Sequence, residues 1–173
     1  MITPDEYRQA LARFATGVTI ITPAGRDGRW WGFTASSFTS LSIDPPLILV
    51  CLANTARCHA VFTSAPGFRV NVLGPEHEQL AVRFATKGAD KFAGNEFRPA
   101  ADGLPILDDA LVNLRCRTVE QTVAGDHTIL IARVEAAQLR PDGTPAVNVD
   151  RRYWDLTPRG GAFGASRHPP KAQ

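Results

Sequence analysis

The sequence has 173 residues, enough for one domain of ordinary size whose core needs no disulfide bond. Its 44% hydrophobic and 21% charged residues exclude a disordered or coiled-coil protein. The net charge of +2 is too balanced for a nucleic-acid binder, so no nucleic-acid partner is expected. No apolar stretch approaches the roughly 20 residues of a membrane span, and no signal peptide or CxxC pair is present. These features predict a cytoplasmic protein that does not associate with membranes.

The N-terminal segment predicts a short amphipathic helix. Thr3 and Glu6 have the spacing of a capping box, and Gly17 ends the pattern. The apolar residues recur at helical spacing and form one stripe, made of Tyr7, Ala10, Leu11 and Phe14.

Strand patterns dominate the rest of the chain. They are expected at residues 18–22, 30–33, 47–52, 68–73, 112–122, 128–139 and 146–149, with helices at about 54–62 and 76–84. Residues 47–52 are apolar throughout, which predicts a strand buried on both faces. The two longest strands are joined at residues 124–126. Many strands with three short helices predict a mainly β fold, a closed or nearly closed barrel rather than a βαβ sheet.

Residues 1–156 are predicted to form the single domain. Residues 157–173 contain Pro and Arg-Gly breaks, little apolar content and no periodicity, so they are predicted to form a disordered tail.

Sequence signatures of several enzyme classes are missing. There is no GxGxxG after a strand, no phosphate-binding GxxxxGK and no GxSxG. His77-Glu78 begins like a zinc protease motif, but Ala81 stands where the second histidine would be. No catalytic or metal-ligating residue is therefore predicted, and a reaction whose chemistry belongs to a bound cofactor fits better.

Residues 34–42 contain six hydroxyl side chains in nine positions. Small hydroxyl groups let a ligand approach the backbone and offer both donors and acceptors, as the pyrimidine edge and phosphate of a flavin require. The competing interpretation is a strand and turn with a hydroxylated solvent face.

The order of the segments resembles the flavin reductase-like family, small NAD(P)H:flavin oxidoreductases that supply reduced flavin to two-component monooxygenases. The resemblance covers about residues 3–156 and rests on segments 17–22, 32–42, 44–52, 68–73, 79–85, 90–92, 103–105, 125–127 and 152–153. It implies a split β-barrel that binds FMN or FAD, usually as a homodimer with the flavin near the subunit interface. It also implies hydride transfer from NADH or NADPH to flavin N5, and a monooxygenase partner reached through diffusing reduced flavin.

The resemblance also assigns site residues by position. The isoalloxazine would be lined by Thr34, Ala35, Ser36 and Ser37, with Ser40 and Ser42 close by. The backbone of Cys51, Leu52 and Ala53 would face the flavin. Thr55 and Arg57 would lie at a helix N-terminus suited to a phosphate; their alternatives are a plain helix cap and a solvated side chain.

A second flavin-contacting stretch would comprise Lys87, Lys91 and Phe92, where Lys91 replaces the arginine of many relatives; the alternative is a surface loop. His127 would lie near the nicotinamide, against the alternative of a merely exposed histidine. Tyr153 would close over the flavin or nicotinamide, although Asp150-Arg151 stands where relatives often have glycine. Trp30, Trp31 and Trp154 are interpreted as core or dimer contacts.

Three other functions remain compatible with the sequence. One is a reductase of the same fold that acts on a corrinoid or ferric chelate. The others are a non-catalytic flavin-binding protein and a β-barrel interaction module. The sequence does not discriminate FMN from FAD or NADH from NADPH, because the acidic residue and the arginine that report this choice in Rossmann folds have no counterpart.

Overall fold

The computed structural model describes residues 1–156, and the predicted tail at 157–173 lies outside the described residues. The helices are α1 (Pro4–Ala12), α2 (His59–Ser64) and α3 (Glu78–Ala85), and a short 3-10 helix, η1 (Pro75–His77), precedes α3. The strands are β1 (Thr16–Gly17), β2 (Thr19–Thr22), β3 (Phe33–Ala35), β4 (Thr39–Ser42), β5 (Leu47–Ala53), β6 (Gly67–Val72), β7 (Phe97–Pro99), β8 (Pro105–Leu107), β9 (Val112–Ala124), β10 (His127–Leu139), β11 (Val147–Val149) and β12 (Arg152–Trp154). No helix among residues 1–156 has both the length and the apolar character needed to cross a bilayer.

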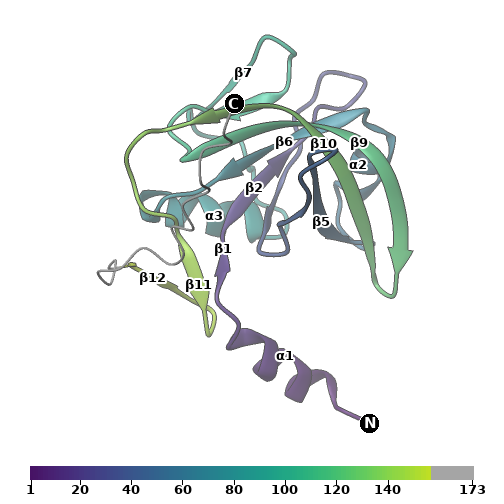
Figure 1. The fold of residues 1–173 in the computed structure, drawn as a ribbon, viewed down its shortest axis with the longest axis vertical. Coiled ribbons are helices and arrows are strands. Elements are labelled where there is room, and N and C mark those ends of the chain that lie inside the picture. Colours follow the sequence, from purple (N-terminus) through teal and green to yellow (C-terminus); the bar gives the residue numbers. More distant parts are fainter. Residues whose placement is uncertain (157–173) are drawn as a thin grey trace, which may run out of the picture.

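A seven-stranded sheet with the order β3-β2-β6-β9-β10-β5-β4 forms the body of the protein (Figure 1). Every neighbouring pair in it is antiparallel. The sheet curls on itself, and its edge strands β3 and β4 are not paired with each other in the described chain, which leaves the barrel open. Two small sheets, β1-β11-β12 and β7-β8, complete the fold. The prediction of a mainly β fold with three short helices is confirmed.

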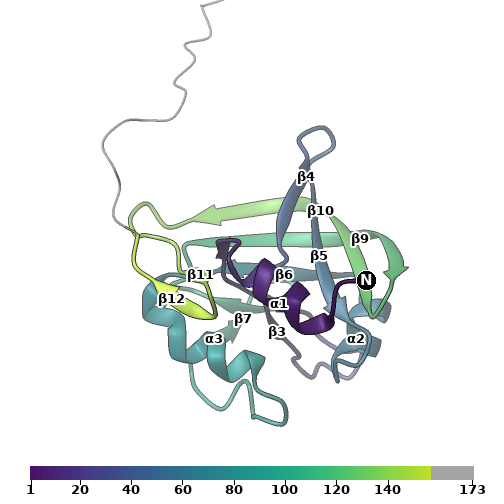
Figure 2. The same ribbon diagram turned by 90° about the horizontal axis from the view of Figure 1, so that it is seen from below.

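Two apolar clusters fill the two sides of the sheet. One lies inside the curled sheet and contains Phe62, Phe68 and Val50. The other lies where α3 packs on β2, and it contains Phe84 and Leu80. Helix α3 lies on the outside of the fold (Figure 2). Adjacent residues Ile20 and Ile21 belong to different clusters, and both are 0% exposed. Strand β2 is therefore buried on both faces.

The expectation that residues 47–52 are buried on both faces is wrong. In β5 buried and half-buried residues alternate: Ile48, Val50 and Leu52 point into the core, while Leu49 and Cys51 lie on the outer face. The reason is that α3 packs over β2, so the outer side of β5 keeps partial access to solvent.

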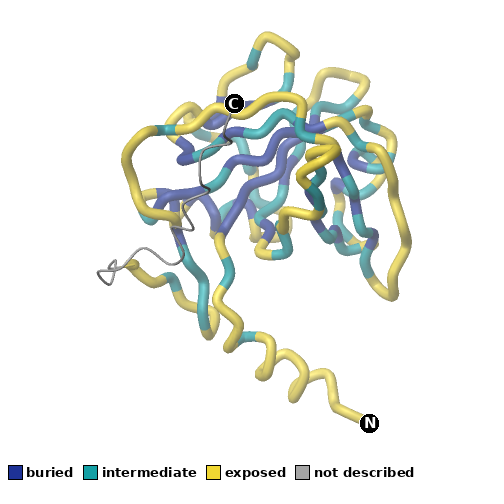
Figure 3. Tube along the Cα trace, viewed as in Figure 1, coloured by how far each residue is buried: buried dark blue, intermediate teal, exposed yellow. Residues whose placement is uncertain are grey.

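Helix α1 begins as predicted and ends earlier than predicted. The Thr3 hydroxyl accepts a hydrogen bond from the Glu6 N–H at 3.2 Å, and Glu6 Oε2 accepts one from the Thr3 N–H at 2.8 Å. The backbone hydrogen bond from Thr3 holds the pKa of Glu6 below its ordinary value. The helix extends away from the barrel, and none of its residues is buried (Figures 1 and 3). Its apolar stripe therefore contacts no core within the described chain.

Candidate functional site

A cavity of about 1040 Å³ lies where three segments of the chain converge. These are the hairpin that leads into β3, the loop that follows β5, and the end of α3 with the loop after it. The lining residues are numbers 28–34, 53, 55–58 and 84–92. This volume is slightly above the range typical of small-molecule sites, roughly 300–1,000 Å³.

Aromatic side chains form much of the cavity wall. The rings of Phe84 and Phe92 meet edge to face with centroids 5.1 Å apart, and Trp30 contacts Phe92 at 5.6 Å. Gly32 lets the chain pass close to this cluster, because a Cβ there would come within 2.7 Å of the Phe84 ring. The wall therefore offers apolar aromatic surface to a planar ligand.

Among residues 1–156, the charged residues that line the cavity are four cations and one acid: Arg29, Arg57, Lys87, Lys91 and Asp90. The Lys91 ammonium donates a hydrogen bond to the Phe84 carbonyl oxygen and lies 5.7 Å from the centroid of the Phe84 ring. Burial lowers the pKa of Lys91. The balance of charge favours an anionic ligand such as a phosphate ester.

The loop that carries Thr55 and Arg57 differs from the prediction. Helix α2 begins only at His59, and Cys58 precedes it without a side-chain cap, so the expected placement of Thr55 and Arg57 at a helix N-terminus is wrong. Asn54 explains the difference, because its backbone N–H donates to the Asp126 carbonyl oxygen at 2.9 Å and anchors the loop to the β9–β10 turn.

A side-chain network holds this loop in place. The Thr128 hydroxyl donates to Asn54 Oδ1 at 2.8 Å, and His59 Nε2 lies 2.9 Å from the same hydroxyl. Since the Thr128 proton is directed at Asn54, Nε2 of His59 is the donor to Thr128. The loop therefore presents Thr55 and Arg57 to the cavity from a fixed backbone.

The hydroxyl-rich segment 34–42 is interpreted from its sequence either as a flavin-binding segment or as a strand and turn with a hydroxylated solvent face, and its hydroxyl groups have different environments in the structure. Thr34 lines the cavity, but its hydroxyl donates to the Ala81 carbonyl oxygen and ties β3 to α3. The Ser37 hydroxyl donates to the Cys51 carbonyl oxygen at 3.2 Å and accepts from the Cys51 N–H at 3.0 Å. Both protons are thus used within the fold, which leaves these two oxygens only as acceptors toward a ligand.

The structure brings seven of the sequence-predicted site residues together in the cavity and places nine outside its lining. The seven are Thr34, Ala53, Thr55, Arg57, Lys87, Lys91 and Phe92. The nine are Ala35, Ser36, Ser37, Ser40, Ser42, Cys51, Leu52, His127 and Tyr153. Ala35 and Leu52 are buried in the first cluster, and Ser40 and Ser42 lie on β4. Flavin contact by any of the sixteen stays a prediction.

His127 lies next to the cavity without lining it. It stands opposite Ala53 in the β5–β10 ladder, and its ring Nδ1 lies 2.7 Å from Asp126 Oδ1. This hydrogen bond with His127 holds the pKa of Asp126 below its ordinary value. Tyr153 packs against the second cluster, and burial raises its pKa.

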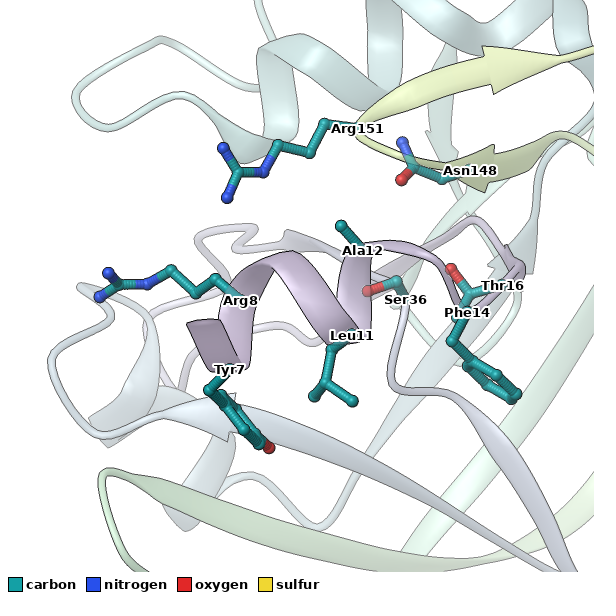
Figure 4. A pocket seen from close by; sticks show the side chains of 9 residues that line it. All are labelled: Tyr7, Arg8, Leu11, Ala12, Phe14, Thr16, Ser36, Asn148 and Arg151. Atoms are coloured by element: carbon teal, nitrogen blue, oxygen red, sulfur yellow. The ribbon is translucent and has the colours of Figure 1, made fainter. Parts of the chain in front are cut away.

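Ser36 lines a second, smaller hollow of about 330 Å³ beside α1 (Figure 4). One side of this hollow is formed by α1 and the residues after it, through Tyr7, Leu11 and Phe14. Arg151, in the turn before β12, forms another side. The apolar stripe of α1 therefore forms part of a concave surface.

Sequence reasoning missed a group of lining residues that includes Arg29, Trp30, Trp31, Phe33, Cys58 and Phe84. The Trp-Trp-Gly run was the available signal, because a glycine beside large aromatic residues marks a close approach of backbone and ring. The sequence alone suggests core or dimer contacts for the tryptophans. Trp30 and Trp31 do pack against the two core clusters, and both also lie in the cavity wall, which the sequence did not predict.

Comparison with known proteins decides the family. Residues 11–157 match the flavin reductase like domain. The chain belongs to this family. It is 48% identical to the actinorhodin polyketide dimerase of Streptomyces coelicolor, covering 90% of this chain and 88% of that protein. It is 41% identical to the NADH:riboflavin 5'-phosphate oxidoreductase of Streptomyces pristinaespiralis, and the match covers 91% of this chain and 90% of that protein.

Two further matches describe proteins of the same family. The reductase component of a 4-nitrophenol 4-monooxygenase/4-nitrocatechol 2-monooxygenase from Rhodococcus opacus is 44% identical, covering 77% of this chain and 71% of that protein. The solved structure of the NADH:FAD oxidoreductase SgcE6 of Streptomyces globisporus, in complex with NAD and FAD fragments, superposes with a TM-score of 0.86. Its sequence is 31% identical, and the match covers 93% of this chain and 99% of that chain.

Proposed function

We propose that this protein is an NADH:flavin oxidoreductase that reduces FMN or FAD and releases the reduced flavin to a separate monooxygenase component. The observation that carries the proposal is the cavity itself, in which aromatic walls and a surplus of cations come from three separate segments. Family membership and the oxidoreductase names of the relatives support it.

The lining residues fit a flavin nucleotide. The half-buried rings of Phe92 and Trp30, backed by the buried Phe84, supply apolar surface for a planar ring system, and Thr34 supplies an acceptor oxygen. Arg57 and Lys87 supply charge for a phosphate, and their loops enter the cavity from two sides. These residues would hold the isoalloxazine in the apolar part of the cavity and the phosphate at its cationic rim.

A bound flavin supplies the redox chemistry, since it accepts a hydride from the nicotinamide at N5. The chain's own contribution is to bind and orient the two ligands and to exclude water, so no strong acid or base is required. The half-buried ammonium of Lys91 would stabilise negative charge on a ligand beside it, because charge interactions are stronger away from solvent.

The monooxygenase partner is supported by the relative from Rhodococcus opacus, which is named as a reductase component. The cytoplasm is the compartment we propose, because all three cysteines are free thiols.

The phosphate subsite can be tested by comparing FMN with riboflavin, which lacks the phosphate. In Arg57→Ala and Lys87→Ala variants we expect the dissociation constant of FMN to rise about 10-fold or more for each lost charge-assisted hydrogen bond, with riboflavin unchanged. Arg13→Ala, an exposed arginine outside the cavity lining, is the matched control. Equal weakening of FMN and riboflavin would contradict the assignment.

We also propose that the protein is a homodimer. The support is the exposed apolar surface on α1, where Tyr7, Leu11 and Phe14 are 54%, 53% and 72% exposed, and the half-buried outer face of β5. A Leu11→Glu/Phe14→Glu double variant should convert a dimeric mass in light scattering to a monomeric one, whereas Gln9→Glu should not. A monomeric mass for the unmodified chain would refute the proposal.

A further inference from the structure

Arg29 and Trp31 lie together at the hairpin side of the cavity. The guanidinium carbon of Arg29 is 4.7 Å from the centroid of the Trp31 ring, and both residues line the cavity. Trp31 packs against the first core cluster, so Arg29 covers a ring that the core holds in place. We name this pair the Arg29–Trp31 shelf and treat it as one surface.

The hairpin that carries the shelf is fixed by its own hydrogen bonds. Gly25 N–H donates to the Arg29 carbonyl oxygen at 2.8 Å, and Asp27 Oδ1 accepts from the Arg29 N–H at 3.0 Å. Trp31 N–H donates to the Pro23 carbonyl oxygen at 3.2 Å. These hydrogen bonds fix the backbone that carries Arg29. Less backbone conformational entropy is therefore lost when a ligand binds to its side chain.

Within the described residues, the Arg29 guanidinium forms no ion pair. The arginine ion pairs found within residues 1–156 involve other arginines. Arg29 instead lies over an aromatic ring, which leaves its guanidinium N–H groups and its outward face to a ligand.

We infer that the Arg29–Trp31 shelf binds the adenine of a dinucleotide, either FAD or NADH. The inference rests on the proposed function and adds to it a subsite for the half of the ligand that does not react. The π face of adenine can stack on a guanidinium or an indole, and this stacking does not depend on which groups hydrogen-bond to the edge of the base. The adjoining pyrophosphate would find donors in the same guanidinium.

The size and charge of the cavity agree with this assignment. Its volume of about 1040 Å³ is slightly above the range typical of small-molecule sites. Its positively charged side chains come from more than one segment of the chain. Arg57 and Lys87 account for one phosphate in the proposed function, so Arg29 is an additional positive charge. A dinucleotide carries a second phosphate and a second ring system, which FMN and reduced nicotinamide mononucleotide lack.

The test compares ligands with and without the adenosine half. Equilibrium dissociation constants are measured for FAD and FMN, and Michaelis constants for NADH and reduced nicotinamide mononucleotide, in wild type and Arg29→Ala. We expect Arg29→Ala to weaken one adenine-containing ligand by roughly 5- to 150-fold, the range of single-base stacking, and to leave its shorter counterpart unchanged. A changed ratio of the FAD and FMN dissociation constants would identify FAD as the source of the adenine. A changed ratio of the Michaelis constants for NADH and reduced nicotinamide mononucleotide would identify NADH.

Two further variants and one probe ligand distinguish binding of adenine by stacking on Arg29 from attraction by its positive charge. Arg29→Lys keeps the positive charge without the planar group, so it should lose most of the same selectivity. Arg26→Ala, an exposed arginine on the same turn and outside the cavity lining, should change nothing. ADP-ribose, which contains no flavin or nicotinamide, should bind wild type more tightly than Arg29→Ala in calorimetry.

Several results would overturn the inference. They are unchanged ratios in Arg29→Ala, equal weakening of the long and short ligands, and full selectivity in Arg29→Lys. Failure of the proposed function gives a different pattern, because wild type would then neither bind FMN nor oxidise NADH with it.

Discussion

The Gly32→Ala substitution, which adds a single methyl group, should disturb the packing of the cavity wall. A Cβ there would lie 2.7 Å from Phe84 Cε1 and 3.0 Å from the Ile21 carbonyl oxygen, against about 3.4 Å or more for ordinary contact. Phe84 has little freedom to withdraw, because it is 0% exposed and its ring contacts Phe92 and Phe97 at centroid distances of 5.1 and 5.2 Å. The ring or the strand must therefore move by several tenths of an ångström.

Overpacking of a filled core costs roughly 1–3 kcal/mol, and Gly32→Ala should fall in the upper half of that range because the opposing atoms are a buried ring and a backbone oxygen. For a chain of this size such a loss lowers the melting temperature by about 4–12 °C. Because Gly32 and Phe84 both line the cavity, the same variant should also bind FMN more weakly.

Urea unfolding gives the stability change, and fluorescence titration with FMN gives the affinity. Gly17→Ala is the matched control, since a Cβ at Gly17 meets nothing within 4 Å and its backbone is not left-handed. If Gly32→Ala were as stable as wild type and bound FMN equally well, the packing of the cavity wall against α3 would be refuted.

Two further predictions concern the cysteines. Burial raises the pKa of Cys116 from 9.0 to about 12, so its neutral thiol stabilises the fold below pH 9 and that contribution is lost as pH rises toward 12. Between pH 8 and 10.5, wild type should lose roughly 2 kcal/mol more unfolding free energy than Cys116→Ala, and parallel losses in urea titrations would contradict the burial of this thiol. Cys58 lines the cavity, and burial raises the pKa of its thiol, so it should alkylate slowly at pH 8. Saturating FMN should slow alkylation of Cys58 more than that of Cys116, as followed by peptide mass spectrometry, whereas equal protection would indicate general stabilisation instead of occupancy of the cavity.

The sequence was most informative where a local pattern determines the local structure. The capping box at Thr3 and Glu6 predicted the start of α1, and Gly125, with φ of 62°, marked the turn between β9 and β10. Both features depend only on residues close together in the chain, so no tertiary contact overrides them.

The sequence was less informative where distant segments decide the outcome. Thr55 looks like a helix cap, but the loop is instead shaped by the bond from Asn54 to Asp126, which lies far along the chain. The two faces of β5 differ because α3 packs over β2 rather than over β5, and an apolar run cannot show where a helix packs. The sequence suggested core or dimer contacts for Trp31, and its packing against the core agrees with this, but only the fold places Arg29 over its ring.

The central claim is that the cavity binds a flavin and presents it to NADH for reduction. The most direct measurement mixes purified protein with NADH in air, with and without added FMN or FAD, and follows the loss of nicotinamide absorbance. We expect rapid oxidation of NADH that depends on added flavin and that is slower in the Arg57→Ala variant. Flavin binding without NADH oxidation would point to flavin storage or sensing, and the absence of both would contradict the proposed function.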